Sequence, residues 1–75
     1  MLGSYMRRKR ATTGINASDV AKVVGVSRQS VSQWEMGTTT PSPNHLADWC
    51  HALQLHDHEV VTAYELRRTM TEGAT

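Results

Sequence analysis

The stretch from Asn16 to Gly37 restricts the fold more than any other part of the chain. Its sequence, NASDVAKVVGVSRQSVSQWEMG, predicts two short helices separated by a tight glycine turn. Asn16 and Ser27 are residue types that favour the N-cap position of a helix. Gly25 follows the last apolar residue of the first helix, where a left-handed residue commonly ends a helix. The stretch therefore predicts a helix-turn-helix unit.

The second predicted helix, which follows Ser27, is polar over most of its surface. Val31 and Trp34 lie three residues apart and form its apolar stripe. The remaining positions of its first two turns are polar, namely Arg28, Gln29, Ser30, Ser32 and Gln33. An ordinary hairpin in a helical bundle is the alternative, but it has no need for arginine and glutamine beside a capped turn. The pattern favours a helix that contacts a partner outside the domain.

At these positions the chain resembles the phage repressor/Cro family, also called the lambda-repressor-like or xenobiotic-response-element family. The matching positions are Ala21, Gly25, Val31, Trp34 and Glu35. The resemblance extends over roughly residues 2 to 55. It implies an all-α fold, a compact five-helix lambda-repressor-like DNA-binding domain whose helices 2 and 3 form the helix-turn-helix motif at residues 16–37.

Three further helices complete the predicted single domain, residues 1–70. The first runs from Leu2 to about Thr13 and ends at Gly14. Another begins after Ser42, with Pro43 in its first turn, where proline is tolerated. Its expected apolar face consists of Leu46, Ala47, Trp49, Cys50 and Leu53.

The last predicted helix, residues 57–70, carries apolar residues on more than one face. This surplus suggests a surface for a partner, which would be a second copy of the chain. Residues 71–75 are expected to be a disordered tail.

Charge is distributed unevenly along the 75 residues. Residues 1–37 hold six basic and two acidic side chains, whereas residues 38–75 hold two basic and five acidic ones. A polyanion such as DNA would therefore approach the N-terminal half. The sequence has no apolar run of the ~18 residues that a membrane span needs, and its lone cysteine fits a reducing compartment. We expect a cytoplasmic protein, bound to the bacterial nucleoid when active, with no membrane partner.

The resemblance assigns base contacts to Arg28, Gln29 and Gln33. Their chemistry agrees, because arginine can bond to O6 and N7 of guanine and glutamine to N6 and N7 of adenine. Ser32 lies on the same part of the helix and is a fourth expected base-reading residue.

Contacts with the DNA backbone are expected from helix N-termini, hydroxyl groups and nearby cations. These candidates are Asn16, Ser18, Ser27, Ser30, Thr38, Thr39, Thr40, Arg7 and Lys9. Two departures from the family predict a weaker affinity for DNA and a shallower salt dependence. Ala17 replaces the usual glutamine at the start of helix 2, and the loop after the reading helix has threonines in place of lysine and arginine.

Arg10 and Glu35 have a different expected role. In the family, the residues at these positions form an ion pair that ties helix 1 to the end of the reading helix. Both residues are present here, so the resemblance implies a structural ion pair between them.

No catalytic or cofactor motif accompanies these residues. His56 and His58, with Cys50 and His51 nearby, lack the ligand spacing of a structural zinc site. There is no glycine-rich phosphate loop and no nucleophile motif. We expect neither enzyme activity nor a metal or cofactor.

The sequence thus predicts a DNA-binding transcriptional repressor, a small phage Cro-like or immunity repressor that binds a pseudo-palindromic operator as a homodimer. Two alternatives remain. The chain is an antitoxin that represses its own operon, or it is a protein-interaction module that uses its acidic C-terminal half to bind another regulator. Arg28→Ala separates these functions, because it abolishes operator binding by a repressor or an antitoxin and has no effect on a protein-interaction module.

Overall fold

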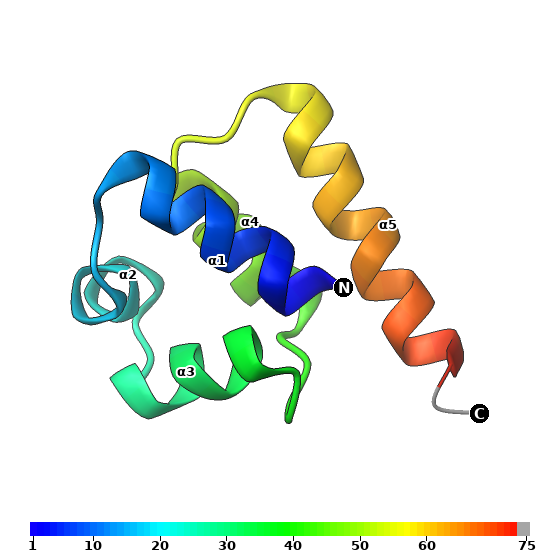
Figure 1. Ribbon diagram of the computed structural model, residues 1–75. Helices are drawn as coiled ribbons and strands as arrows, with labels where there is room; N and C mark the ends of the chain where they lie inside the picture. Colours follow the sequence, from blue (N-terminus) through cyan, green and yellow to red (C-terminus); the bar gives the residue numbers. More distant parts are fainter. Residues whose placement is uncertain (74–75) are drawn as a thin grey trace.

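Within residues 1–73, the chain forms five helices, as predicted: α1 (Leu2–Thr13), α2 (Ala17–Val24), α3 (Arg28–Met36), α4 (Pro43–Ala52) and α5 (Asp57–Gly73). They are described from a computed structural model that covers the backbone of residues 1–73 and the side chains of residues 1–69. Helix α1 contacts both α3 and α5, while α2 contacts α3 and α4. Figure 1 shows α2 and α5 at opposite ends of the molecule, with α1 between them.

The predicted caps fix where the helices begin. The Asn16 Oδ1 atom accepts a hydrogen bond from the Asp19 N–H at 2.8 Å, and the Ser27 Oγ atom accepts one from the Ser30 N–H at 3.1 Å. Ser42 caps α4 in the same way. Gly25 has the left-handed φ of 83° that glycine adopts without strain, so the turn between α2 and α3 forms as expected.

Helix α5 is longer than the sequence predicted. It begins at Asp57 as expected and continues past the predicted end at residue 70 to Gly73, so residues 71–73 are helical. The rest of the predicted tail, residues 74–75, lies outside the described residues. No helix in the described part of the chain is both long and apolar enough to cross a membrane.

All five helices contribute to the core, α5 through the fully buried Ala63, and the core contains both tryptophans. The Trp34 ring packs against those of Trp49 and His45, with centroid distances of 5.3 and 5.6 Å. Cys50 is buried as predicted, and burial raises the pKa of its thiol to about 11. Ala47 was expected on the buried face of α4 but is exposed, because it lies beside rather than within the stripe formed by Leu46 and Trp49.

Candidate nucleic-acid interface

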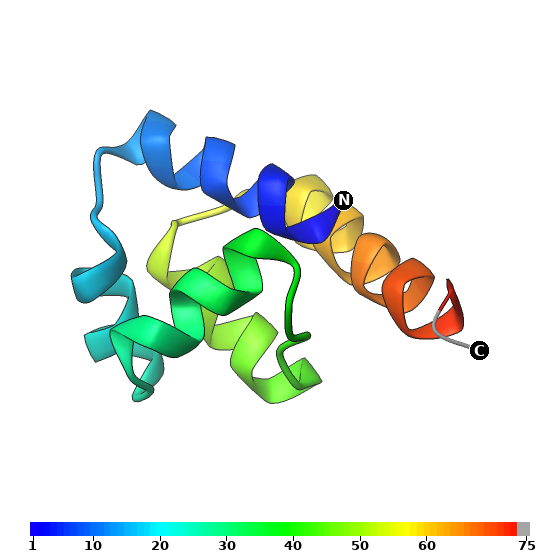
Figure 2. The ribbon, with the colours of Figure 1, turned by 60° about the horizontal axis from the view of Figure 1, so that its bottom comes forward.

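Helix α3 presents one buried face and one polar face. Val31 is fully buried and Trp34 is 6% exposed, so these two residues fix the orientation of the helix about its axis. Arg28 and Gln29 are exposed on its first turn, whereas Ser32 and Gln33 are half-buried on the second. Figure 2 shows α3 at the front of the molecule, with α1 above it and α2 beside its first turn. The four predicted base-reading residues are thus spread over the first two turns of one helix.

Helix α1 holds the end of α3 through a bidentate ion pair. The Arg10 Nε–H donates to Glu35 Oε2 at 2.6 Å, and the Nη2–H donates to Glu35 Oε1 at 3.1 Å. A third bond runs from Arg10 Nη1 to the carbonyl oxygen of Ile15 at 3.2 Å. The Glu35 side chain is only 8% exposed. This confirms the predicted pair and shows that Arg10 also fixes the start of the α1–α2 connection.

A second contact between α1 and α3 involves only backbone atoms. Gly3 is buried against the carbonyl oxygens of Trp34 and Glu35, with which a methyl group at Gly3 would collide. Sequence reasoning missed this residue. The available signal was a glycine inside a helix, which costs about 1 kcal/mol relative to alanine and is commonly explained by a close approach of another segment.

The predicted backbone contacts at the helix N-termini are partly occupied within the chain. Asn16 and Ser27 accept the capping bonds described above, and the Ser27 and Ser30 hydroxyl oxygens lie 3.0 Å apart. Ser18 is half-buried in the first turn of α2. The capping bonds fix the starts of α2 and α3. The capping side chains stay partly exposed beside the free N–H groups of these helix starts, which attract anions.

The loop after α3 is anchored at both ends. The Thr38 hydroxyl donates to the Gln33 carbonyl oxygen at 3.1 Å, so its proton is engaged in ending α3. Thr39 and Thr40 are exposed. Beyond them, Arg67 of α5 donates through Nε to the Pro41 carbonyl oxygen at 2.8 Å. The loop is therefore held between α3 and α5, and all three of its threonines are exposed.

The two cations predicted on α1 lie in different environments. Arg7 is exposed, whereas Lys9 is half-buried and forms an ion pair with Glu59 of α5. Its ammonium group also lies 5.3 Å from the centroid of the Tyr5 ring. Lys9 is thus directed towards α5, and Arg7 is the better placed of the two for an external phosphate.

Met36 is an exposed residue of α3 that sequence reasoning did not single out. It is 79% exposed and lies three residues after Gln33, on the continuation of the polar face. The signal was present in the spacing, because residues three apart on a helix are neighbours. Among the described residues, no three His, Cys, Asp or Glu side chains are close enough together to hold a metal ion.

Comparison with known proteins places this arrangement in a family. The family model described as "Helix-turn-helix" matches residues 6–60. The repressor protein C2 of Salmonella phage P22 is 35% identical over 54 residues, which are 72% of this chain and 25% of that protein. The chain therefore spans about a quarter of the length of that relative.

A solved structure shares the fold. The clp gene regulator ClgR from C. glutamicum superimposes with a TM-score of 0.73 and 32% sequence identity, over 83% of this chain and 80% of that one. Helices α1 to α4 and the first residues of α5 lie within the segment that the family model matches. The chain therefore belongs to the HTH_3 helix-turn-helix family, the lambda-repressor-like DNA-binding transcriptional regulators, which are not enzymes.

Proposed function

We propose that this chain is a sequence-specific repressor of transcription that reads an operator through α3, as a small phage Cro-like or immunity repressor does. One observation supports this most strongly. The exposed polar side of α3 combines Arg28 and Gln29 on a helix that Trp34, Gly3 and the Arg10–Glu35 pair hold rigidly in the domain. Rigid support of this kind is what base reading requires, because hydrogen bonds to base edges tolerate little displacement.

In this proposal the first turn of α3 enters the major groove. Arg28 bonds to a guanine, and Gln29 and Gln33 bond to adenines, each good bidentate pair contributing ~1–3 kcal/mol of discrimination. Ser32 completes the reading surface. The capped starts of α2 and α3, together with Arg7, Thr39 and Thr40, lie against the sugar-phosphate backbone and fix the orientation of the domain.

A single domain covers about half of such a site. Two copies bound to a pseudo-palindrome, with half-site centres about 34 Å apart, would supply the specificity that one α3 lacks. The proposed homodimer would act in the cytoplasm at the nucleoid, with double-stranded DNA as its partner.

The charge pattern sets the expected strength of binding. Lys9 is already paired with Glu59, and the loop after α3 contributes hydroxyl groups instead of cations. Few phosphates are therefore neutralised, so log K should fall with log salt with a slope smaller than about 6. A steeper slope would contradict this account of the backbone contacts.

The test of the proposal is selection from a pool of random duplex DNA by the purified protein, followed by sequencing of the retained molecules. An enriched inverted repeat is the expected result, and its spacing gives the separation of the two reading helices. A protein that remains folded at low salt and enriches no sequence would overturn the proposal.

A matched pair of variants then assigns the reading to α3. Arg28→Ala should lower affinity for the selected site by ~5- to 150-fold, with little change on random DNA of the same length. Arg8→Ala removes the same charge from an exposed position on α1 and should change both affinities equally. Equal losses of affinity for the two variants would show that Arg28 contributes general electrostatic attraction and not base reading.

The same experiments separate the remaining alternatives. An antitoxin would also enrich an operator, but its affinity for that operator would rise in the presence of a toxin encoded beside it. A protein-interaction module would enrich no DNA sequence, and Arg28→Ala would leave its partner binding unchanged. The acidic residues of α4 and α5 would then carry the interaction.

A further inference from the structure

The outer face of α3 ends in a large apolar side chain. Met36 is 79% exposed, although methionine is among the residues most often buried. It lies three residues after Gln33 and four after Ser32, so it continues the row of expected base-reading side chains. With about 3.6 residues per turn, Met36 lies about 140° around the helix from Val31 and about 160° from Trp34, the two buried residues of α3. Packing of the domain therefore does not account for this methionine.

The domain leaves space beside the Met36 side chain. Met36 borders a hollow of about 320 Å³ at the start of α1 and the end of α3, lined also by Met1, Gly3, Ser4 and Gly37. Figure 2 shows these two helix ends next to one another. Methionine is unbranched and flexible, and its sulfur is polarizable, so it adapts to the shape of what it contacts. The side chain can therefore reach an external group without displacing a packed neighbour.

The end of α3 is poorly suited to bind a phosphate. Its last turn has no basic residue, and the C-terminus of a helix carries the negative end of the helix dipole. The carbonyl oxygens of Gln33 and Trp34 already accept from the N–H groups of Thr38 and Gly37. In the major groove, the apolar group that base edges present is the C5-methyl of thymine. An exposed thioether at this end of α3 therefore fits a thymine better than the DNA backbone.

We propose that Met36 is a further specificity residue of α3, and that its side chain packs on the C5-methyl group of a thymine in each operator half-site. This inference rests on the proposed reading of DNA by α3. A helix rises ~1.5 Å per residue, so Met36 lies ~12 Å along α3 from Arg28, which corresponds to about three base pairs. The thymine thus lies about three base pairs from the guanine that Arg28 reads, on the side of the base that Gln33 reads.

The first test removes the methyl group from the DNA. Each thymine in one half-site of the selected operator is replaced in turn by deoxyuridine, which keeps the hydrogen-bonding groups of the base and lacks only the C5-methyl. Replacement of the thymine that Met36 contacts should lower the affinity of the wild type about fourfold. The same replacement should leave the affinity of Met36→Ala unchanged, because the apolar partner is already absent. Equal losses for wild type and Met36→Ala at every thymine would overturn the proposal.

The second test repeats the selection from random DNA with variants of the protein. Met36→Ala should lose the preference for this thymine and keep the preferences at the bases that Arg28 and Gln29 read. Met36→Leu retains a large apolar side chain and should keep the thymine preference. Loss of the preference at the bases read by Arg28 or Gln29 in Met36→Ala would show that Met36 acts through the position of α3, and would contradict a direct contact.

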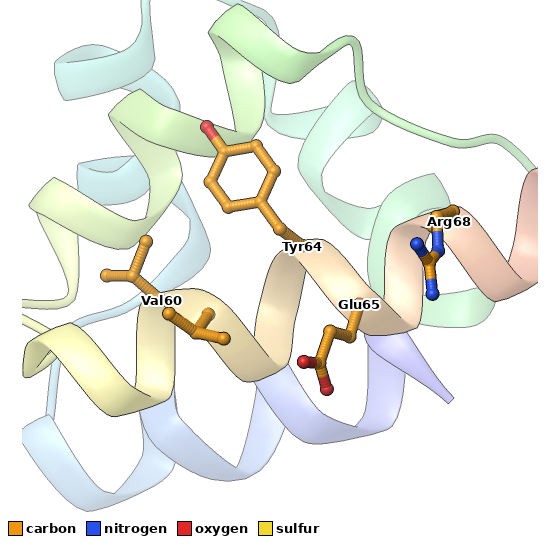
Figure 3. A pocket seen from close by; sticks show the side chains of 5 residues that line it. Val60, Tyr64, Glu65 and Arg68 are labelled. Carbon is orange, nitrogen blue, oxygen red and sulfur yellow. The ribbon is translucent and has the colours of Figure 1, made fainter.

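The matched control is Val61→Ala. Val61 is 56% exposed and borders a hollow of about 300 Å³, so it resembles Met36 in exposure and setting. Figure 3 shows that hollow on α5, bordered by Val60 and Tyr64. Because α5 is not the reading helix, Val61→Ala should keep the thymine preference and the full effect of deoxyuridine, whatever its total affinity. Loss of the thymine preference in this control as well would remove the assignment to Met36.

Failure of this inference is distinguishable from failure of the repressor proposal. Circular dichroism establishes that each variant is folded. If Met36→Ala lowers the affinity for operator and random DNA by the same factor, Met36 contacts the sugar-phosphate backbone and the thymine contact is excluded. If the wild type enriches an operator in which no thymine depends on Met36, the inference fails and the repressor proposal stands. A folded wild-type protein that enriches no sequence would overturn both.

Discussion

Ion pairs join α1 to both α3 and α5, and two neighbouring residues of α1 form them. Arg10 holds Glu35 of α3, whereas Lys9 holds Glu59 of α5. The first pair is bidentate, nearly enclosed and reinforced by the Gly3 backbone contact. In the second pair the lysine and glutamate side chains are 32% and 14% exposed, compared with 22% and 8% for the arginine and glutamate of the first. The ion pair that joins α1 to α3 is therefore the more enclosed of the two. Helix α5 is also held by Arg67 and Tyr64, whose side chains donate to the carbonyl oxygens of Pro41 and Pro43.

This difference matches what the two helices present to solvent. The outer side of α3 is polar, and it gains from rigidity because its side chains must meet fixed hydrogen-bonding positions on a partner. The outer side of α5 is apolar, and an apolar contact tolerates small adjustments of position. The chain thus concentrates its most directional interactions beneath the polar surface of α3.

The largest expected effect comes from breaking the Arg10–Glu35 ion pair, which holds α3 against α1. Arg10→Met should lower the free energy of unfolding by about 3 kcal/mol or more, because it leaves the Glu35 carboxylate almost buried without its cation. Urea denaturation measures this change. Arg8→Met, at an exposed position of the same helix, should change stability by less than about 0.5 kcal/mol. Similar losses for the two variants would mean that the pair does not clamp α3.

The backbone contact gives the second prediction. Alanine normally stabilises a helix relative to glycine by about 1 kcal/mol, but Gly3→Ala should instead destabilise this domain by about 2 kcal/mol. The added methyl group must push α1 away from the backbone carbonyl oxygens of Trp34 and Glu35, which cannot rotate aside as the end of a flexible side chain would. The measurement is again urea denaturation, with Ser4→Ala as the neighbouring control. A neutral or stabilising effect of Gly3→Ala would show that α1 does not approach the backbone of α3 closely at this residue.

Much of the candidate site could be predicted from the sequence because its signals are local. The caps at Asn16 and Ser27, the glycine at the turn and the apolar pair Val31 and Trp34 all act within a few residues. These features fix which side of α3 is exposed without knowledge of the rest of the fold. The Arg10–Glu35 pair, which joins distant residues, came from the family resemblance instead.

The remaining contacts could not be predicted because they depend on how the helices are placed relative to one another. The close approach at Gly3, the Lys9–Glu59 pair and the Arg67–Pro41 bond each link segments far apart in the sequence. Lys9 illustrates the problem. Within the run of residues 7–10 it has the same local signal as its neighbours, and only the position of α5 directs it away from an external phosphate.

The third prediction concerns the loop between α3 and α4. Arg67→Met removes the donor to the Pro41 carbonyl oxygen and should lower stability by about 1 kcal/mol, since the bond is only partly buried. Amide hydrogen exchange should also become faster at Thr39 and Thr40, while protection within α3 is retained. Faster exchange throughout α3 would show that the reading helix depends on α5 after all, and the contrast between the two helices would fail.

The smallest effect is expected from the tie between α1 and α5, and it should depend on pH. The bond from Lys9, followed by that from the His56 N–H, lowers the pKa of Glu59 below its ordinary value of 4.5. A lowered pKa means that the carboxylate stabilises the fold above pH 4.5, and that this contribution is lost as the pH falls through the folded-state value. Glu59 in turn raises the pKa of Lys9 above 10.5, so the same contribution is lost again as the pH rises past the raised value.

Glu59→Gln isolates this contribution, because the amide oxygen still accepts from the His56 N–H while the charge is removed. The difference in melting temperature between the wild type and Glu59→Gln should be small at pH 7 and smaller at pH 3, because the Glu59 carboxylate is increasingly protonated as the pH falls through its lowered pKa. Arg10→Met, whose loss also disrupts the bond to Ile15, should remain destabilising at both pH values. A solvated ion pair contributes little to stability, whereas removing one partner of an enclosed bidentate pair leaves a buried charge. The effect of Glu59→Gln should therefore be the smaller one. An effect as large as that of Arg10→Met would show that α3 and α5 are held equally.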